Sequence, residues 1–243
     1  MIPAWNIANE DCSVFHSKLL DNSIDCIITD PPYFVGFKNK IYDDSADLIH
    51  TKAPQWFKEW FRILKDNCYL YIFVGVKTMH LWIKYGIEAG FTYKNVIATR
   101  SFNNGSPTPK NSFGFQFQPI LIFSKGKGKP YNDVNFFPTS KEWFKDKRNK
   151  NPKPYTYQYP NFIPTSISFA TEKRSTKNLH PNEKNVKLIK FLIEISTNVN
   201  DIVLDSFAGS FSTAVACKQC NRIFYGCELD KDLYEKGLER IQS

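Results

Sequence analysis

One stretch of this sequence, residues 24–33, restricts the possible folds more than any other and reads IDCIITDPPY. Its first six residues form a short apolar run with β-branched side chains, which predicts a buried strand. Pro31 and Pro32 then end the strand, because neither has a backbone N–H to donate. Asp30 precedes a proline and is therefore held in an extended conformation. We call residues 30–33 the DPPY step: a stiff strand end that presents a carboxylate, carbonyls and the ring of Tyr33.

The groups of the DPPY step suit an amine on a flat ring. An –NH₂ group has two donors, of which the Asp30 carboxylate can accept one and the Pro31 carbonyl the other. The ring of Tyr33 can stack on the face of the bound ring. In an open α/β sheet, ligands bind beyond the carboxyl ends of the strands, where this step is expected. The alternative is that the prolines merely end a strand and that Tyr33 packs in the core; the short motif alone leaves both open.

Length and composition predict one sizeable domain, since the chain has 243 residues of which 42% are hydrophobic. We expect no signal peptide and no membrane span, because the longest apolar run, residues 68–76, is too short. The six cysteines are scattered. Cys217 and Cys220 form a lone C-x-x-C without a histidine pair, so we predict no metal site. A reducing cytoplasm is the expected compartment.

The net charge is +8, and the excess lies in the middle of the chain. Residues 100–180 contain 14 Lys or Arg against 4 Asp or Glu, whereas the rest of the chain contains 18 basic and 20 acidic side chains. This distribution is typical of a segment that faces nucleic-acid phosphates on an otherwise neutral enzyme. A solvated basic loop region is the alternative.

The order of expected elements predicts a mostly parallel α/β sheet, since strands alternate with helices. Between residues 101 and 178 only one strand is expected, and the remainder of that segment is predicted to pack as an irregular subdomain. The expected strands are 24–29, 68–74, 91–100, 117–124, 201–204 and 222–227, and the expected helices are 54–66, 77–90, 185–196 and 230–241.

A second site is predicted at residues 205–217, DSFAGSFSTAVAC, which indicate a strand end, a turn of small residues and a helix. Glu228 comes 23 residues after Asp205, and an acid at about this distance binds ribose hydroxyls in nucleotide-binding βαβ units. Only Gly209 lies in the turn, so the G-x-G-x-x-G pattern of pyrophosphate sites is missing. A nucleoside without phosphates fits better, and S-adenosylmethionine is such a ligand. An ordinary βαβ turn with an unrelated acid is the alternative.

Taken together, these motifs resemble those of the DNA amino-methyltransferases. DPPY is the motif of the adenine-N6 enzymes, and F-S-K-G at residues 123–126 resembles a strand end of their sheet. The matches to the family's D-P-F-x-G-S-G-T-T turn are Asp205, Phe207, Gly209, Ser210 and Thr213. The matches to its H-P-T-Q-K-P segment and to its N-terminal D-C or D-A pair are His180, Pro181 and Lys184, and Asp11 and Cys12.

The order of the motifs is that of the β class, a circular permutation of the usual methyltransferase sheet. The resemblance covers roughly the first 125 and last 65 residues, and it implies a three-layer, mostly parallel, doubly wound, Rossmann-like α/β fold. Residues 1–100 are then the catalytic part of the methyltransferase domain and residues 180–243 the cofactor-binding part of the same domain. Residues 101–179, which include the strand near 117–124, form an inserted, irregular target-recognition region.

The resemblance implies an S-adenosylmethionine-dependent, site-specific DNA methyltransferase that modifies the N6 amine of a flipped-out adenine. Its partner is double-stranded DNA; a homodimer and a cognate restriction nuclease are left open. The implied catalytic residues are Asp30, Pro31, Pro32 and Tyr33. The implied cofactor-binding residues are Asp11, Cys12, Asp30, His180, Lys184, Asp205, Phe207, Ala208, Gly209, Ser210 and Glu228.

Several residues depart from the family pattern. Ser206 replaces a proline, and Glu183 adds a negative charge. Phe211 replaces a glycine in the first helical turn, where its side chain could crowd the methionine end of the cofactor. Four alternatives stay open to different degrees. Methylation of cytosine N4 is disfavoured because enzymes of that kind usually begin the motif with serine, and RNA is a weaker alternative substrate. A nucleic-acid-binding protein with a degenerate cofactor site is another, and a nicotinamide dehydrogenase is disfavoured by the missing glycine pattern.

Overall fold

The computed structural model describes residues 5–34, 36, 44–100, 117–132, 166–167 and 184–242. Most of the expected target-recognition region lies outside these residues, and so do His180, Pro181 and Glu183. In the part of the chain that is described, no helix is both long and apolar enough to cross a membrane.

The elements alternate along the chain as expected for an α/β fold. The strands are β1 (Asn6–Ala8), β2 (Ile24–Thr29), β3 (Leu64–Phe73), β4 (Thr92–Arg100), β5 (Phe117–Ser124), β6 (Ser166–Ile167), β7 (Ile202–Asp205) and β8 (Ile223–Cys227). The helices are α1 (Cys12–Ser17), the 3-10 turn η1 (Ala46–Leu48), α2 (Ile49–Ile63), α3 (Met79–Glu88), α4 (Val186–Ser196), α5 (Ser212–Gln219) and α6 (Lys231–Gln242).

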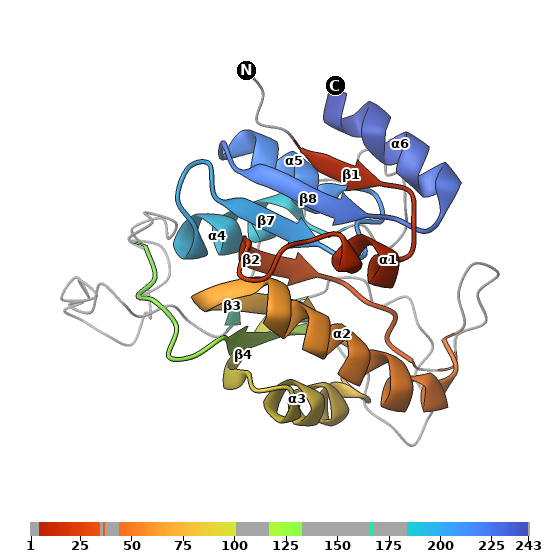
Figure 1. The fold of residues 1–243 in the computed structure, drawn as a ribbon, viewed down its shortest axis with the longest axis vertical. Helices are drawn as coiled ribbons and strands as arrows, with labels where there is room; N and C mark the ends of the chain where they lie inside the picture. Colours follow the sequence, from red (N-terminus) through yellow and green to blue (C-terminus); the bar gives the residue numbers. More distant parts are fainter. Residues whose placement is uncertain are drawn as a thin grey trace, which may run out of the picture.

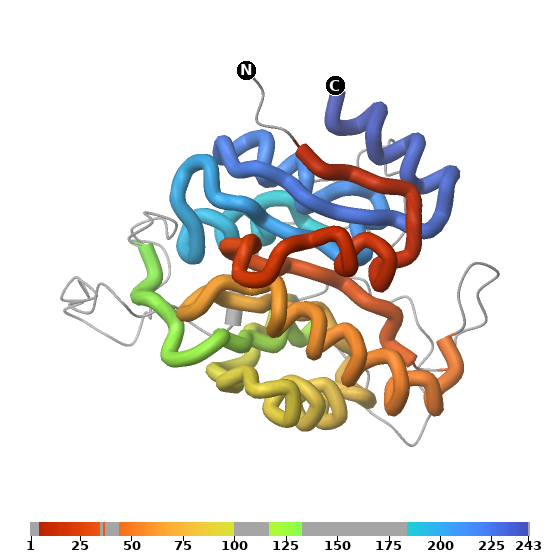
Figure 2. Tube along the Cα trace, viewed as in Figure 1, coloured from red at the N-terminus to blue at the C-terminus, as the bar shows by residue number. Residues whose placement is uncertain are grey.

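The strands of the described residues form one sheet in the order β1-β8-β7-β2-β3-β5-β4-β6 (Figure 1). Neighbouring strands are parallel except at β5, which runs antiparallel to both β3 and β4. The N-terminal strand β1 pairs with β8 near the C-terminus, so red and blue segments lie side by side in Figure 2. At the centre, β2 pairs with β7, which places the DPPY step and the turn after β7 at the same edge of the sheet.

Helices cover both faces of the sheet, and each face has its own core (Figure 1). One core holds aromatic side chains of α1, α2 and α3, including Phe15, Trp60 and Trp82. The other holds α4 and α5, with Leu192 and Ala216 buried and Tyr234 of α6 packed against them. The predicted three-layer, mostly parallel fold is therefore confirmed.

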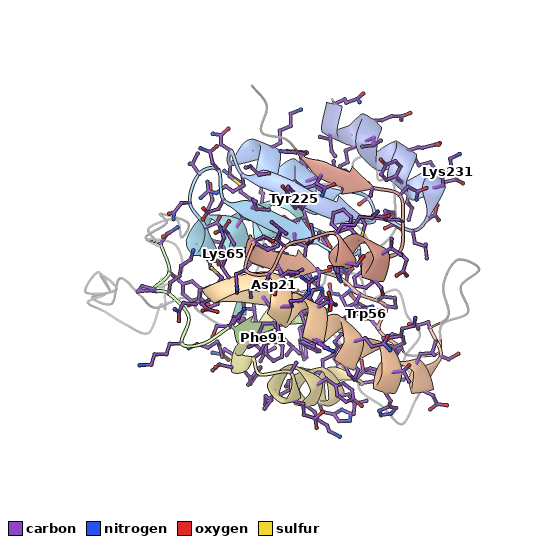
Figure 3. All side chains as sticks on the ribbon, in the orientation of Figure 1. Asp21, Trp56, Lys65, Phe91, Tyr225 and Lys231 are labelled. Carbon is purple, nitrogen blue, oxygen red and sulfur yellow. The ribbon has the colours of Figure 1, made fainter. Side chains whose placement is uncertain are left out.

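Strand β2 carries one charge, Asp25, and its burial is satisfied by hydrogen bonds. One carboxylate oxygen of Asp25 accepts the backbone N–H of Ile202 at 3.0 Å and the other lies 2.7 Å from the ammonium of Lys65, which is labelled in Figure 3. A buried carboxylate without such donors would cost several kcal/mol. Asp25 therefore ties β2 to β7 and β3 without disturbing the strand.

Several sequence expectations about the elements and their bounds were wrong. The helix expected at residues 54–66 begins at Ile49, with Pro54 inside it, and ends at Ile63. Leu64 opens β3 instead, because it is fully buried and pairs with Ile24 of β2. Strand β1 was not expected at all, since its three residues pair with β8 from the far end of the chain. Only one strand was expected between residues 101 and 178, yet β6 also lies there and pairs with β4.

Candidate active site

Asp30 lies directly after β2, and both oxygens of its carboxylate are engaged. The hydroxyl of Tyr33 donates to Oδ1 at 2.7 Å, and the ammonium of Lys184 lies 2.6 Å from Oδ2. Among the described residues, none donates a hydrogen bond to the carbonyl of Pro31. The step therefore presents an oriented carboxylate beside a carbonyl that is free to accept.

The conformation of the DPPY step is set by the residue that follows it. Phe34 has a positive φ of 53° and its N–H donates to Oδ1 of Asp44 at 2.7 Å. Its buried ring stacks on Trp56 and Trp82, with centroids 5.8 and 6.2 Å away. Because Phe34 fills the core, Tyr33 stays half-buried at the edge of the sheet.

The hydroxyl of Tyr33 joins three elements. It accepts hydrogen bonds from Nε2 of Gln118 on β5 and from the ammonium of Lys184, 3.2 Å away, while it donates to Asp30. The backbone carbonyl of Tyr33 accepts from Oγ1 of Thr78 at 3.0 Å. Sequence reasoning missed Gln118 and Thr78, and no motif marks either of them, because only the pairing of β5 with β3 brings Gln118 to the step.

The turn after β7 is organised around a buried carboxyl. Asp205 accepts the N–H of Phe207 at 3.1 Å and the hydroxyl of Thr213 at 2.6 Å. Burial raises the pKa of the Asp205 carboxyl to about 7. The structure thus places Asp205 inside the turn, where it holds the backbone in shape.

Glu228, at the end of β8, closes the same turn from outside. One of its oxygens accepts the N–H of Gly209 at 2.7 Å and the other accepts the N–H of Asp230 at 2.8 Å. Gly209 has a φ of 51°, which glycine adopts at little cost. Burial raises the pKa of Glu228. Each carboxylate oxygen retains a further acceptor position, so the part-buried Glu228 can still receive hydroxyl donors.

The N-terminal pair lies at the same edge. The pairing of β1 with β8 lets the N–H of Glu228 donate to the carbonyl of Ala8 at 3.1 Å. Asp11 is exposed and caps α1, accepting the N–H of Ser13 at 2.8 Å. Cys12 is buried, and burial raises its pKa to about 12. A thiol of that kind stays protonated and is unsuited to act as a nucleophile.

Phe211, whose effect on the methionine end of the cofactor the sequence left open, packs in the core beside α5 and α6. Its ring is fully buried, edge-on to Phe224 and Tyr234 with centroids 6.1 and 6.0 Å away. Its φ of 60° is the left-handed conformation that a glycine at this position would adopt readily. The neighbouring Ser210 is buried, and its carbonyl accepts from Nη1 of Arg240 at 2.8 Å.

Ser206, which stands where the family has proline, belongs to a buried hydrogen-bond network. Its Oγ accepts from Nε1 of Trp60 at 2.9 Å and shares a hydrogen bond with Nε2 of His16 at 2.8 Å. The Nδ1 atom of His16 has no partner in the described part of the chain. Burial lowers the pKa of the His16 imidazole to about 4. The network is therefore built for a neutral histidine.

We expect the pH dependence of the protein's stability to reflect the lowered pKa of His16. The pKa of His16 falls from an ordinary 6.5 to about 4 in the native state. Between pH 6.5 and 4, His16 is therefore protonated in the unfolded state but neutral in the native state. Unfolding is favoured by up to about 3 kcal/mol at the acid end. Asp205 changes the stability in the opposite direction. Its raised pKa lets the native state bind a proton before the unfolded state does as the pH falls from about 7, which favours folding.

The measurement is urea unfolding of the wild type and of His16→Gln at pH 7 and pH 4.5. His16→Gln should be destabilised at pH 7, where the network is lost, and the deficit should shrink by about 2–3 kcal/mol at pH 4.5. The matched control is His80→Gln, since His80 is exposed and its replacement should leave the pH dependence unchanged. A constant deficit for His16→Gln would contradict the assignment.

One tryptophan joins the two parts of the site. The ring of Phe207 lies edge-on to Trp56 at 4.8 Å, and Trp56 stacks on Phe34 behind the DPPY step. Trp56 is labelled on α2 in Figure 3. The turn after β7 and the DPPY step are thus neighbours in one packed unit, although about 175 residues separate them in the sequence.

Metal ligation is not indicated by the side chains described. No group of three or more His, Cys, Asp or Glu side chains in these ranges is arranged to hold a metal ion. The six cysteines are free and buried.

The doubly wound sheet thus brings a small-residue turn, a carboxylate at the next strand end and the DPPY step together at the carboxyl edge of the strands, where ligands bind in folds of this class. Residues 24–239 match the family model described as DNA methylase. The chain therefore belongs to the DNA methylase family.

Individual relatives agree with this assignment. The chain is 29% identical over 248 residues to the DNA adenine methyltransferase YhdJ of Escherichia coli (strain K12). The aligned region covers 98% of this chain and 83% of YhdJ. It is 28% identical over 231 residues to the type II methyltransferase M.HpaI of Haemophilus parainfluenzae, covering 93% of this chain and 70% of the relative. The solved complex of M1.HpyAVI with SAM shares 26% identity with a TM-score of 0.63, covering 97% of this chain and 98% of that one.

Proposed function

We propose that this protein transfers a methyl group from S-adenosylmethionine to the N6 amine of adenine in DNA. The observation that carries the proposal is the DPPY step: Asp30 is held at the end of β2 by Tyr33 and Lys184, next to the Pro31 carbonyl, which accepts no hydrogen bond from the residues that the structure describes. These are the acceptors that the two N–H groups of an exocyclic amine require. The relatives named as adenine or type II DNA methyltransferases support the same reaction.

The residues of the step have separate tasks. Asp30 accepts one N–H of the amine and Pro31 accepts the other, which leaves the nitrogen lone pair pointing away from both. Tyr33 stacks on the base and limits its orientation, so most of the rate comes from positioning. As the N–C bond forms, the methyl–sulfur bond would break and the nitrogen would gain positive charge, which the Asp30 carboxylate stabilises. The proton of the N–H bonded to Asp30 would then pass to that carboxylate and on to solvent. Pro32 keeps the step extended.

The residues around the turn after β7 fit a nucleoside with a charged methionine tail. Glu228 retains acceptor positions for two ribose hydroxyls, and Gly209 lets the ligand approach the backbone. Asp11, Phe207, Ala208 and Ser210 border the same edge. When bound there, S-adenosylmethionine supplies an activated methyl group on a positively charged sulfur.

The target adenine has to leave the duplex, because its amine is otherwise paired with thymine. We propose that residues 101–179 hold the double-stranded DNA, on the strength of their positive charge. The methyltransferase domain is then made of residues 1–100 and 180–243. We place the protein in the cytoplasm, since the six cysteines are free thiols.

The test is a methyl-transfer assay with S-adenosylmethionine and unmethylated duplex DNA, followed by mass spectrometry of the nucleosides. We expect N6-methyladenine. Recovery of N4-methylcytosine instead would replace adenine by cytosine as the target, and methylation of RNA alone would exclude DNA. No cofactor binding in a calorimeter would indicate a nucleic-acid-binding protein with a degenerate site.

Replacement of Glu228 by alanine should weaken S-adenosylmethionine binding by about 2–3 kcal/mol, because charged hydrogen bonds to the ribose are lost and the N–H of Gly209 is left without its acceptor. Isothermal titration calorimetry measures the difference. Glu235→Ala is the matched control, since Glu235 carries the same charge on the exposed side of α6. If Glu228→Ala and Glu235→Ala bind the cofactor equally well, the cofactor site lies elsewhere.

A further inference from the structure

We propose that Lys184 is a positioning residue for methyl transfer: it acts through Asp30, whose carboxylate it holds in the orientation that receives the target amine. This inference rests on the proposed function and extends it to a residue at the start of α4. Sequence matching groups Lys184 with the cofactor-binding segment. The structure places its ammonium 2.6 Å from Oδ2 of Asp30 instead.

The ion pair is sheltered from solvent. The side chain of Lys184 is 16% exposed and that of Asp30 26%, so water screens this pair less than a surface pair. The ammonium also lies 5.3 Å from the centroid of the Phe73 ring, which covers it on one side. Removing one partner of such a pair leaves the other charge poorly compensated.

Each of the two partners of Asp30 binds one oxygen of its carboxylate. Tyr33 donates to Oδ1 and Lys184 to Oδ2, while a second donor of Lys184 reaches the Tyr33 hydroxyl at 3.2 Å. This triangle restricts rotation of the carboxylate about its side-chain bonds. A carboxylate has about four acceptor positions, so two remain for the amine after both partners are bound. The base can therefore enter without displacing the lysine.

The position of Lys184 is itself fixed. Asn185, the next residue, caps α4 by accepting the N–H groups of Lys187 at 2.9 Å and Leu188 at 3.2 Å. The first turn of α4 is packed through buried Leu188 and Ile189. Lys184 thus projects from a rigid helix start in the C-terminal part of the chain onto the catalytic step in the N-terminal part.

The experiment compares Lys184→Met with Lys184→Arg and with Lys190→Met. Lys190 forms an i,i+4 ion pair with Glu194 on the same helix, so its replacement removes a comparable charge away from Asp30. We expect Lys184→Met to lower kcat by about 10- to 100-fold, the effect typical of a misplaced catalytic group. Cofactor affinity should change less than about twofold, Lys184→Arg should recover part of kcat, and Lys190→Met should match the wild type.

A double-mutant cycle shows whether Lys184 acts through Asp30. In the Asp30→Asn background, Lys184→Met should cause no further loss of single-turnover methyl transfer, because the group it positions has already been changed. An additional loss of the same size as in the wild-type background would overturn the inference. So would an unchanged or raised kcat in Lys184→Met, or a drop confined to cofactor affinity.

A structural readout separates this inference from the proposed function. If the wild type produces no N6-methyladenine, the proposed function fails, and the role of Lys184 is judged from crystal structures of the wild type and Lys184→Met. Departure of the Asp30 carboxylate from the Tyr33 hydroxyl in the variant supports the inference. An Asp30 side chain in the same place in both structures overturns it.

Discussion

Replacement of Asp30 by alanine is expected to slow methyl transfer to adenine by about 10²- to 10⁴-fold, the range for loss of a group that handles the reacting proton. The carboxylate is the one acceptor at the step that can balance the positive charge developing on the amine. The rate of methyl transfer by Asp30→Asn should lie between those of Asp30→Ala and the wild type, since the amide oxygen still accepts one N–H but carries no charge. Single-turnover transfer of a labelled methyl group measures the three rates.

The binding of duplex DNA separates a chemical defect from a folding defect. We expect Asp30→Ala to bind DNA within a few-fold of the wild type in fluorescence anisotropy, because the phosphate contacts lie elsewhere. Asp232→Ala, at an exposed position of α6, is the matched control and should keep full activity. Comparable rates for Asp30→Ala and the wild type would remove Asp30 from the catalytic group.

Replacement of Phe211 by glycine is expected to destabilise the protein by about 1–4 kcal/mol. Truncating a buried phenylalanine costs about 3–5 kcal/mol, while relief of the left-handed backbone returns about 1–2 kcal/mol. The loss of packing is larger than the relief of backbone strain, because the ring is fully buried against Phe224 and Tyr234. Urea unfolding at neutral pH measures the change, and cofactor affinity should stay close to that of the wild type.

Gly237 provides the complementary test of the same contact. A Cβ added at Gly237 of α6 would lie 1.7 Å from Cδ2 of Phe211, so Gly237→Ala should destabilise the wild type by about 1–3 kcal/mol through overpacking. In the Phe211→Gly background the clash is absent, and Gly237→Ala should be neutral or stabilising. If Phe211→Gly instead leaves stability unchanged and tightens cofactor binding, the ring faces the cofactor as the family pattern had suggested.

Local chemistry was strong enough to predict several elements from the sequence alone. The strand at residues 117–124 was predicted with the bounds that β5 has, because its apolar run is closed by Ser124 and the Lys-Gly turn. The last helix was predicted at residues 230–241 and is found at Lys231–Gln242, where the carboxylate of Asp230 accepts the N–H groups of Asp232 and Leu233. In both places the decisive interactions lie within a few residues of each other.

Contacts between distant segments decided what the sequence could not. Lys184 was matched to a cofactor segment by register alone, and only the pairing of β2 with β7 and the packing of α4 bring it to Asp30. Phe211 looked like an obstacle to the ligand because its side-chain direction depends on a backbone angle that the sequence does not state.

The sequence by itself determined the α/β alternation, the DPPY step and the acid at the end of β8. These rest on proline chemistry, on strand periodicity and on spacing along the chain, all of which are local. The tertiary structure alone decided which side chains meet at the step and which are buried beneath the turn after β7. The hydroxyl of Tyr33 accepts hydrogen bonds from Gln118 of β5 and from Lys184, which precedes α4. Ser206 bonds with Trp60 and His16. Each of these contacts joins residues at least 85 positions apart, where no local preference reaches and only packing sets the partners.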